Sequence, residues 1–263
     1  MLLCLFFGYE WYEQKVKFRA EDPDEWMLNG SDVWLAAHPV DNDVRRIIYT
    51  HRVIRLANAL FVLMRAPAKG LEVLKERFLA RSTKSCFIEA EIASSLVFNG
   101  FQVEILKEHG KKGEDFDLLA TKDGATISVE VTSKLDGALT VKRIKNTLQA
   151  KRRQVSPDRP AVLYIHVPAD WMRLELESMP VFDEAFQKFM SSSRRFNVIV
   201  LASEAVVPYL NGGIPTTLTR ACFNNRPRHP LEHPGLFQVQ LGKTASFLER
   251  LRSTRAATAK RRS

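Results

Sequence analysis

Two groups of acids stand near corresponding ends of what the sequence predicts to be adjacent strands. Asp115 and Asp117 begin one stretch, with strand residues expected over 116–121, and Glu130 lies in a second stretch over 126–132. An Asp-Gly pair between the stretches favours the positive φ angles of a tight hairpin turn. Carboxylates placed this way suggest a divalent metal. The alternative is an ordinary half-buried hairpin whose open face carries solubilising charges.

Side chains alternate along a strand, and this assigns faces within the hairpin. Asp115 and Asp117 share one face of the first strand, while Glu130, Thr132 and Lys134 share one face of the second. The β-branched residues between them take the other face. The acids therefore stand apart from the apolar side of the hairpin.

A fourth acid lies on the helix expected over 85–99, which Gly100 ends as a C-cap. Advancing 100° per residue places Glu89 near the middle of the broad apolar face of this helix, whereas Glu91 points to the polar side. A carboxylate among apolar side chains is costly unless something pairs with it. A metal-bound water or a lysine would do so, and the alternative is a structural salt bridge.

A basic helix is predicted downstream of the hairpin, over 141–155. It contains no acid, and its cations suit a phosphate backbone, which rewards each neutralised charge by releasing counterions. The alternative is a solvated basic face. The basic residues of this helix are Lys142, Arg143, Lys145, Lys151, Arg152 and Arg153.

The order of elements resembles the PD-(D/E)XK nuclease superfamily, which has the restriction-endonuclease-like fold. A helix with Glu89, three strands, the basic helix and further strands over 161–167 and 197–202 follow one another between residues 83 and 205. The resemblance implies an α/β fold class with an αβββαβ core, in which helices flank a mixed central sheet. A mainly helical N-terminal element would precede this core.

Individual positions carry the resemblance. Asp115 and Phe116 resemble the Pro-Asp-Phe step of the family, with Glu114 in place of proline, and Glu130 resembles the acid of its third motif. Glu89 would be the acid of the first helix. The stretch from Asn146 onward is similar to the helix after the motif strand, which makes Gln149 and Gln154 candidates for contacts with phosphate or with the metal surround.

The family's chemistry is hydrolysis of phosphodiester bonds assisted by Mg²⁺ or Mn²⁺. The resemblance implies that Asp115, Glu130 and the Val131 carbonyl ligate the ion, and that Glu89 binds a second ion or a metal-bound water. Asp117 is the reserve ligand. The expected substrate is DNA in preference to RNA, although no base-reading motif is present to distinguish them.

One departure from the family concerns the lysine that normally follows the glutamate by two residues. Thr132 occupies that position, and Lys134 lies two residues further, about 6.6 Å along the same strand face. We expect Lys134 to act as the substitute that orients water or stabilises charge. The alternatives are a catalytically inactive module of the same fold that binds nucleic acid or a protein, and an unrelated α/β protein with surface acids.

Charge and organisation agree with a nucleic-acid partner. The net charge of +9 lies entirely in residues 81–263, which hold 28 Lys and Arg against 19 Asp and Glu, whereas residues 1–80 hold 11 of each sign. Three scattered cysteines favour a reduced, cytoplasmic setting. Residues 1–8 are too short an apolar run for a signal peptide or membrane span and predict a strand or packing segment.

The chain divides into three expected parts. Residues 1–80 form a mainly helical cap or partner-binding element, with helices over 44–65 and 71–80 through which a protein partner or a second copy could bind. Residues 81–210 form the nuclease-like domain. Residues 211–263 form an irregular segment, beginning with a loop at 211–215, and a basic tail.

Overall fold

A computed structural model describes residues 2–12, 42–66, 68–80, 83–110, 113–133, 139–167, 175–209 and 212–237. Lys134 and the basic tail lie outside the described residues. The helices and strands follow one another in the order α1(Leu2–Phe7), α2(Tyr9–Tyr12), α5(Asn42–Arg65), α6(Leu71–Ala80), α7(Thr83–Phe98), β1(Gln102–Ile105), β2(Leu118–Lys122), β3(Ala125–Thr132), α8(Val141–Arg152), β4(Ala161–His166), α10(Glu175–Ser192), β5(Val198–Tyr209), β6(Gly212–Phe223) and a short 3₁₀ helix, Pro234–Phe237.

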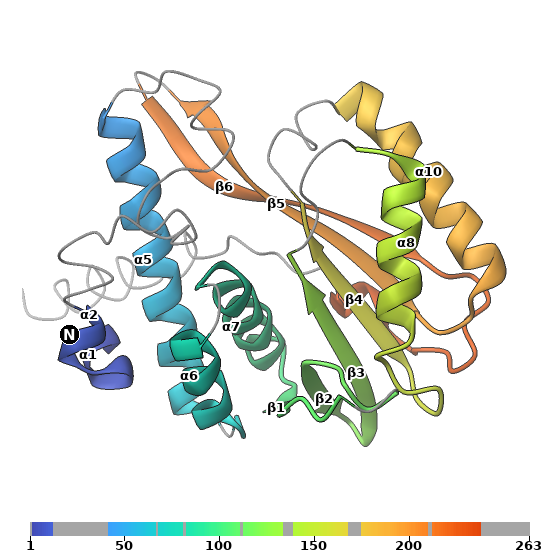
Figure 1. The fold of residues 1–263 in the computed structure, drawn as a ribbon, viewed down its shortest axis with the longest axis horizontal. Helices are drawn as coiled ribbons and strands as arrows, with labels where there is room; N and C mark the ends of the chain where they lie inside the picture. The colour runs from blue at the N-terminus through green and yellow to red at the C-terminus, as the bar shows by residue number, and fades with distance from the viewer. Residues whose placement is uncertain are drawn as a thin grey trace, which may run out of the picture.

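The strands form one six-stranded mixed sheet whose spatial order follows the chain, from β1 to β6 (Figure 1). β1, β2 and β3 pair antiparallel, β3 to β5 run parallel, and β6 returns antiparallel to β5. The parallel pairs are connected through α8 and α10. This mixed sheet flanked by helices confirms the predicted α/β fold class and the αβββαβ order from α7 to β4.

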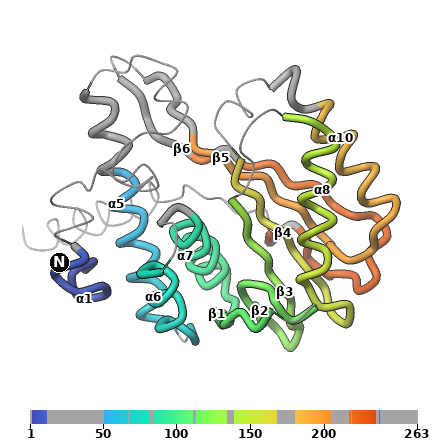
Figure 2. The backbone as a smooth tube through the Cα atoms, viewed as in Figure 1, coloured from blue at the N-terminus to red at the C-terminus, as the bar shows by residue number. Residues whose placement is uncertain are grey.

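Helices cover both faces of the sheet and form two apolar cores. One core joins α1, α5, α6 and α7 to the sheet and contains Leu56, Phe78 and Ile92. The other lies under α8 and α10 and contains Leu148 and Phe182. The backbone trace in Figure 2 shows α8 and α10 side by side on one face, and the N-terminal helices gathered on the other.

The predicted hairpin turn is present. Asp123 and Gly124 both have positive φ angles, 51° and 80°, between the paired residues Lys122 and Ala125. Two positive φ angles match the right-handed twist of the flanking strands, and Asp-Gly is a sequence that adopts them at low cost. The sequence therefore predicted this turn, and the structure adds the register of the two strands. Gly100, with φ of 84°, likewise ends α7 as expected.

Two predicted segments differ from the structure. Residues 2–7, expected as a strand or packing segment, form a helix that packs into the first core through Leu3, Phe6 and Phe7. The loop predicted at 211–215 is wrong, because Gly212 already begins β6 and Pro215 pairs with Val206. Proline is tolerated there because β6 is an edge strand, where a missing N–H costs no ladder bond.

In the described ranges, no helix combines the length and the apolar character needed to cross a membrane, including the 24-residue α5.

Candidate active site

The candidate site lies where β2 and β3 separate. Their ladder ends at the pair Leu118 and Val129, and beyond it the Leu106 N–H donates to the Asp117 carbonyl. The Asp117 side chain then bridges the gap, since its Oδ2 accepts the Val131 N–H at 2.8 Å. A carboxylate thus replaces the backbone carbonyl that the ladder would have supplied, and this fixes Asp117 against the strand that carries Glu130.

Glu130 is the most deeply buried acid of the site, with a side chain 1% exposed. It lies on β3 opposite Leu163 of the buried strand β4. Its Oε1 atom accepts a hydrogen bond from Lys151 Nζ at 2.5 Å. Its Oε2 atom is buried and has no hydrogen-bond partner among the described residues. One half of this carboxylate is therefore paired with a cation, and the other half is unsatisfied.

The acids of the site disfavour one another's charge. Burial raises the pKa of Glu130 well above its usual value, repulsion from Asp117 and Glu89 adds to the shift, and Lys151 opposes it. Burial also raises the pKa of Asp117, although the Val131 N–H and the Arg77 guanidinium act against the shift. The carboxylates thus lie close enough to repel, and a further cation would favour their charged forms.

Glu89 is held by an arginine that the sequence reading did not single out. Arg77 of α6 donates to the Glu89 Oε2 atom at 2.6 Å, and both side chains are buried. The same guanidinium nitrogen lies 3.7 Å from Asp117 Oδ1, and the other donates to the Leu106 carbonyl. The salt-bridge alternative for Glu89 is therefore present. The apolar stripe of α6 gave no signal for Arg77, because a cation at its edge is the usual pattern of a surface helix.

Asp115 lies in different surroundings from Glu130 and Asp117. Its Oδ1 atom accepts the backbone N–H groups of His109 at 2.9 Å and Gly110 at 3.0 Å. It therefore organises the turn before β2, whereas Asp117 is the aspartate that contacts the strand of Glu130, through the Val131 N–H. The strict alternation of the sequence pattern could not separate the two aspartates, because they fall on the same face.

The basic helix presents two kinds of residue. Thr140 caps α8 by accepting the Arg143 N–H, and Ile144 and Leu148 turn one face into the second core. Lys151 leaves the basic face and reaches Glu130, with a side chain 21% exposed. The remaining predicted contact residues are at the surface, either exposed or half-buried: Lys142, Arg143, Lys145, Gln149, Arg152, Arg153 and Gln154.

The position at which the family has its lysine is enclosed here. Thr132 is 6% exposed, near the end of β3. Lys151, on the helix that follows the strand, supplies an ammonium to Glu130. Spacing along the strand could not reveal this, because the contact joins residues 21 positions apart on different elements.

The donor chemistry of the site fits one divalent cation better than two. Hard carboxylate oxygens from Glu130 and Asp117 suit Mg²⁺ or Mn²⁺, and the unsatisfied Glu130 Oε2 provides a free acceptor. Glu89 already pairs with Arg77. Among the described residues, no three His, Cys, Asp or Glu side chains gather in a group that could hold a metal, so the remaining ligands would be water and substrate.

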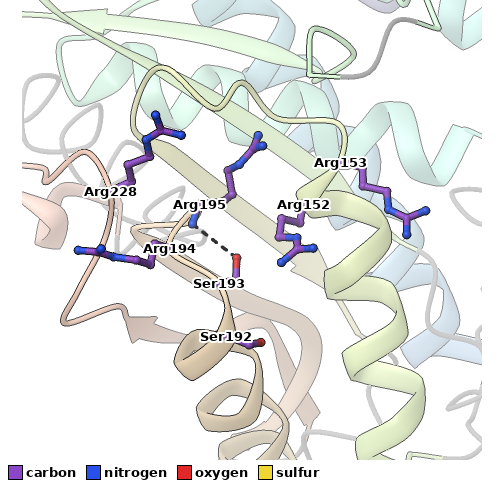
Figure 3. A pocket seen from close by; sticks show the side chains of 7 residues that line it. All are labelled: Arg152, Arg153, Ser192, Ser193, Arg194, Arg195 and Arg228. Atoms are coloured by element: carbon purple, nitrogen blue, oxygen red, sulfur yellow. Dashed lines mark hydrogen bonds between the residues drawn. The ribbon is translucent and has the colours of Figure 1, made fainter.

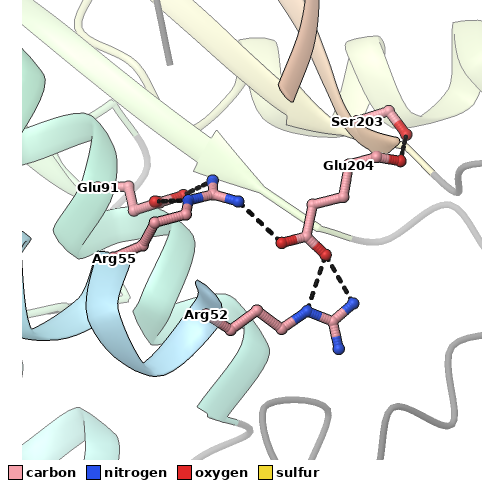
Figure 4. Close-up of polar contacts among 5 residues, drawn as sticks. All are labelled: Arg52, Arg55, Glu91, Ser203 and Glu204. Atoms are coloured by element: carbon pink, nitrogen blue, oxygen red, sulfur yellow. Dashed lines mark hydrogen bonds and ion pairs between the residues drawn. The ribbon is translucent and has the colours of Figure 1, made fainter. Parts of the chain in front are cut away.

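A second buried charge network ties the N-terminal helices to the sheet (Figure 4). Arg55 of α5 makes two hydrogen bonds of 2.5 Å to Glu91 of α7 and one of 2.9 Å to Glu204 of β5. Arg52 donates twice more to Glu204. Glu91, expected on the polar side of its helix, is therefore an interior ion-pair partner, because α5 covers that side.

The charge network shifts the titration of its members. The pKa of Glu204 falls to about 2, since Arg52 and Arg55 together outweigh the opposing effect of burial. Burial and then Arg55 lower the pKa of His51 to about 4. We infer that this network holds α5 in place, because Arg52 and Arg55 pair with carboxylates on α7 and β5.

Comparisons with known proteins give little guidance. No protein-family model matches the chain, and no curated protein matches it. One solved structure that it resembles is SfsA of Pyrococcus furiosus in complex with Ca²⁺, with a TM-score of 0.25 and 13% sequence identity. The match covers 55% of this chain and 63% of SfsA, so it spans less than two thirds of that protein. At this TM-score the likeness carries no conclusion about fold or function.

Proposed function

We propose that this protein is a nuclease that hydrolyses phosphodiester bonds with the help of Mg²⁺ or Mn²⁺, on DNA in preference to RNA. The observation that carries the proposal is Glu130. Its buried carboxylate has one oxygen on the Lys151 ammonium and the other without a hydrogen-bond partner in the described part of the chain, beside a second fixed acid, Asp117. A purely structural ion pair has no need of the unsatisfied oxygen or of the second acid.

Each residue of the site has a role in this reaction. Glu130 and Asp117 would hold the cation, with the Val131 carbonyl as an adjoining oxygen, and a bound divalent ion lowers the pKa of water and neutralises phosphate charge. Lys151 places its ammonium where negative charge grows on the attacked phosphate. The Val131 N–H keeps Asp117 oriented toward Glu130. The contact of Lys151 with Glu130 supports Lys151 for the role expected of Lys134.

The outer face of α8 would contact the nucleic acid. Lys142, Arg143 and Lys145 are exposed, and Arg153 extends the same charge to the end of the helix. Lys142, Arg143 and Lys145 precede Lys151 on the same helix, so a strand bound along α8 would lead to the acid site. Contacts of this kind act on the phosphate backbone and carry no sequence information by themselves.

A second candidate function is binding without cleavage, and Arg77 is the observation that favours it. Its guanidinium pairs with Glu89 and lies 3.7 Å from Asp117. Arg77 therefore already balances part of the negative charge that a metal cation would neutralise. A module of this fold that has lost the chemistry would bind nucleic acid or a protein partner through the same basic face.

Cleavage assays separate the two functions. Supercoiled DNA, single-stranded DNA and RNA are incubated with Mg²⁺ or Mn²⁺ and with the native protein, Lys151→Met or Lys188→Met. Lys188 is an exposed lysine on α10 that pairs with Glu184, so it controls for loss of a positive charge. We expect cleavage by the native protein and Lys188→Met, and a loss of about 10²-fold or more in Lys151→Met. Unchanged cleavage by Lys151→Met refutes the role of this lysine, and binding without any cleavage favours the second function.

A further inference from the structure

An arginine-rich cleft lies between the ends of α8 and α10, and its lining begins at Arg152, the residue after Lys151. Arg152 and Arg153 border it on α8, Arg194 and Arg195 follow α10, and Arg228 comes from the segment after β6. We call this site the arginine cleft. Its volume is about 610 Å³, which is within the range of small-molecule sites. Figure 3 shows the five arginines around its rim, with Ser192 and Ser193 at the end of α10.

Hydrogen bonds to the backbone fix the walls of the arginine cleft. Arg195 donates to the Val155 carbonyl at 2.9 Å, which ties the segment after α10 to the segment after α8. Arg194 donates through Nε to the Arg226 carbonyl at 3.0 Å, and the Arg228 N–H donates to the Arg194 carbonyl. The three segments are therefore joined to one another, and the arginines project from a connected frame.

The charge in the arginine cleft is not balanced by acids. Within the described ranges, none of the five arginines forms an ion pair with a carboxylate, and Asp158 is the acid whose field reaches Arg195. Burial lowers the pKa of Arg195, and repulsion from Arg152 and Arg228 lowers it further. This repulsion between arginines raises the free energy of the unliganded protein, and a bound anion would reduce it.

We propose that the arginine cleft binds the terminal phosphate monoester of a nucleic-acid strand. A monoester carries a charge of about −1.5 to −2 and three acceptor oxygens, whereas an internal diester carries a charge of about −1 and two free oxygens. Guanidinium groups bind phosphate through paired N–H donors, and the adjacent serine hydroxyls can add to them. Five arginines around one concave site therefore suit a terminal phosphate dianion better than an internal phosphodiester.

The position of the arginine cleft links the strand end to the acid site. Lys151 contacts Glu130, and the next residue, Arg152, borders the cleft, with Cα atoms about 3.8 Å apart. A strand whose end is held by the arginines would thus place a phosphodiester near its terminus beside Glu130. The inference rests on the proposed function, and it predicts that the protein acts near strand ends.

Binding measured without metal tests the inference independently of cleavage. Fluorescence anisotropy in EDTA compares one oligonucleotide bearing a 5′-phosphate, a 3′-phosphate or only hydroxyl ends. Four proteins are compared: the native protein, the double variant Arg195→Gln with Arg228→Gln, the single variant Arg228→Gln, and the control Lys188→Gln. Arg228 is exposed, so its substitution alone should not disturb the fold. We expect one phosphorylated end to bind about tenfold or more tightly than the hydroxyl end. The double variant should lose this preference, Arg228→Gln should reduce it, and the control should keep it.

Several outcomes would overturn the inference. Equal affinity for all three ends refutes it, and equal weakening of all three in the variants assigns the arginines to internal phosphates. An ATP competitor that displaces the hydroxyl-ended and phosphorylated strands equally, with loss of ATP binding in the double variant, assigns the cleft to free nucleotides. A retained end preference without cleavage refutes the nuclease proposal alone, whereas cleavage without an end preference refutes this inference alone.

Discussion

Removing Lys151 should cost stability in a way that depends on pH. Lys151→Met keeps most of the side-chain volume and deprives Glu130, which is 1% exposed, of the ammonium 2.5 Å from its Oε1 atom. A buried carboxylate without a cation takes up a proton instead of staying charged. Glu130 should therefore remain protonated to a higher pH in the variant than in the native protein.

The size of the stability loss in Lys151→Met depends on the pH at which Glu130 loses its proton. Burial and Asp117 already raise the pKa of Glu130 above 4.5 in the native protein, and losing Lys151 raises it further. A pKa raised by folding contributes stability at low pH that is lost as pH rises through the folded pKa. Above the native pKa, each pH unit should cost the variant about 1.36 kcal/mol relative to the native protein, until the variant's own pKa is reached.

The limit near pH 8 is about 4.8 kcal/mol, since pH 8 lies about 3.5 units above 4.5. Because the pKa of Glu130 is already raised in the native protein, the loss should stay below this limit. Below about pH 4.5 the loss should vanish, because Glu130 is protonated in the folded and unfolded chains alike.

Urea unfolding followed by circular dichroism between pH 4 and pH 8.5 measures this difference. Adding Glu130→Gln to Lys151→Met should remove the pH dependence, and Lys188→Met should show little loss at any pH, because exposed pairs contribute about 0.5 kcal/mol or less. A loss that is equal at pH 5 and pH 8, or that persists with Glu130→Gln, would refute the reasoning.

Three further predictions concern the frame of the site and its basic face. Arg55→Met should lower the free energy of unfolding by about 3 to 5 kcal/mol in denaturant titrations, because it leaves two buried carboxylates with one fewer cation; a loss under about 1 kcal/mol would contradict this. Gly70→Ala should destabilise the protein far more than Gly110→Ala in thermal melts. Both glycines have positive φ angles, but an added Cβ would lie 2.1 Å from a backbone oxygen at Gly70 and in open space at Gly110. Lys142→Gln should flatten the log-log salt dependence of nucleic-acid binding by about 0.7 to 0.9 if its side chain contacts one phosphate, and an unchanged slope would place it outside the interface.

Elements with a local signal were predictable from the sequence. The hairpin follows from the Asp-Gly turn between apolar stretches, and helices were expected over 71–80 and 141–155, where α6 and α8 lie. The αβββαβ order came from these elements in sequence. β6 was missed because Gly212 and Pro215 are turn residues locally, and the long pairing with β5 overrides that preference.

The site was predictable in kind and less so in its members. The sequence placed Glu89 on an apolar helix face and Glu130 on the hairpin, and the structure shows that both are buried. It could not choose Asp117 over Asp115, since the choice depends on where the β2–β3 ladder ends. Arg77 and Lys151 contact the acids from other helices, and tertiary contacts of this kind leave no spacing pattern. The same holds for Arg195 and Arg228, whose segments meet only in the folded chain.

Calorimetric titration with Mn²⁺ tests the central claim most directly, that Glu130 and Asp117 form the cation site. The native protein should bind one Mn²⁺, more tightly as pH rises because Glu130 must lose its proton. Glu130→Gln and Asp117→Asn should each abolish the binding, while Asp115→Asn should leave it intact, since Asp115 bonds to the His109 and Gly110 N–H groups. Binding that survives both Glu130→Gln and Asp117→Asn, or that disappears with Asp115→Asn alone, would contradict the account.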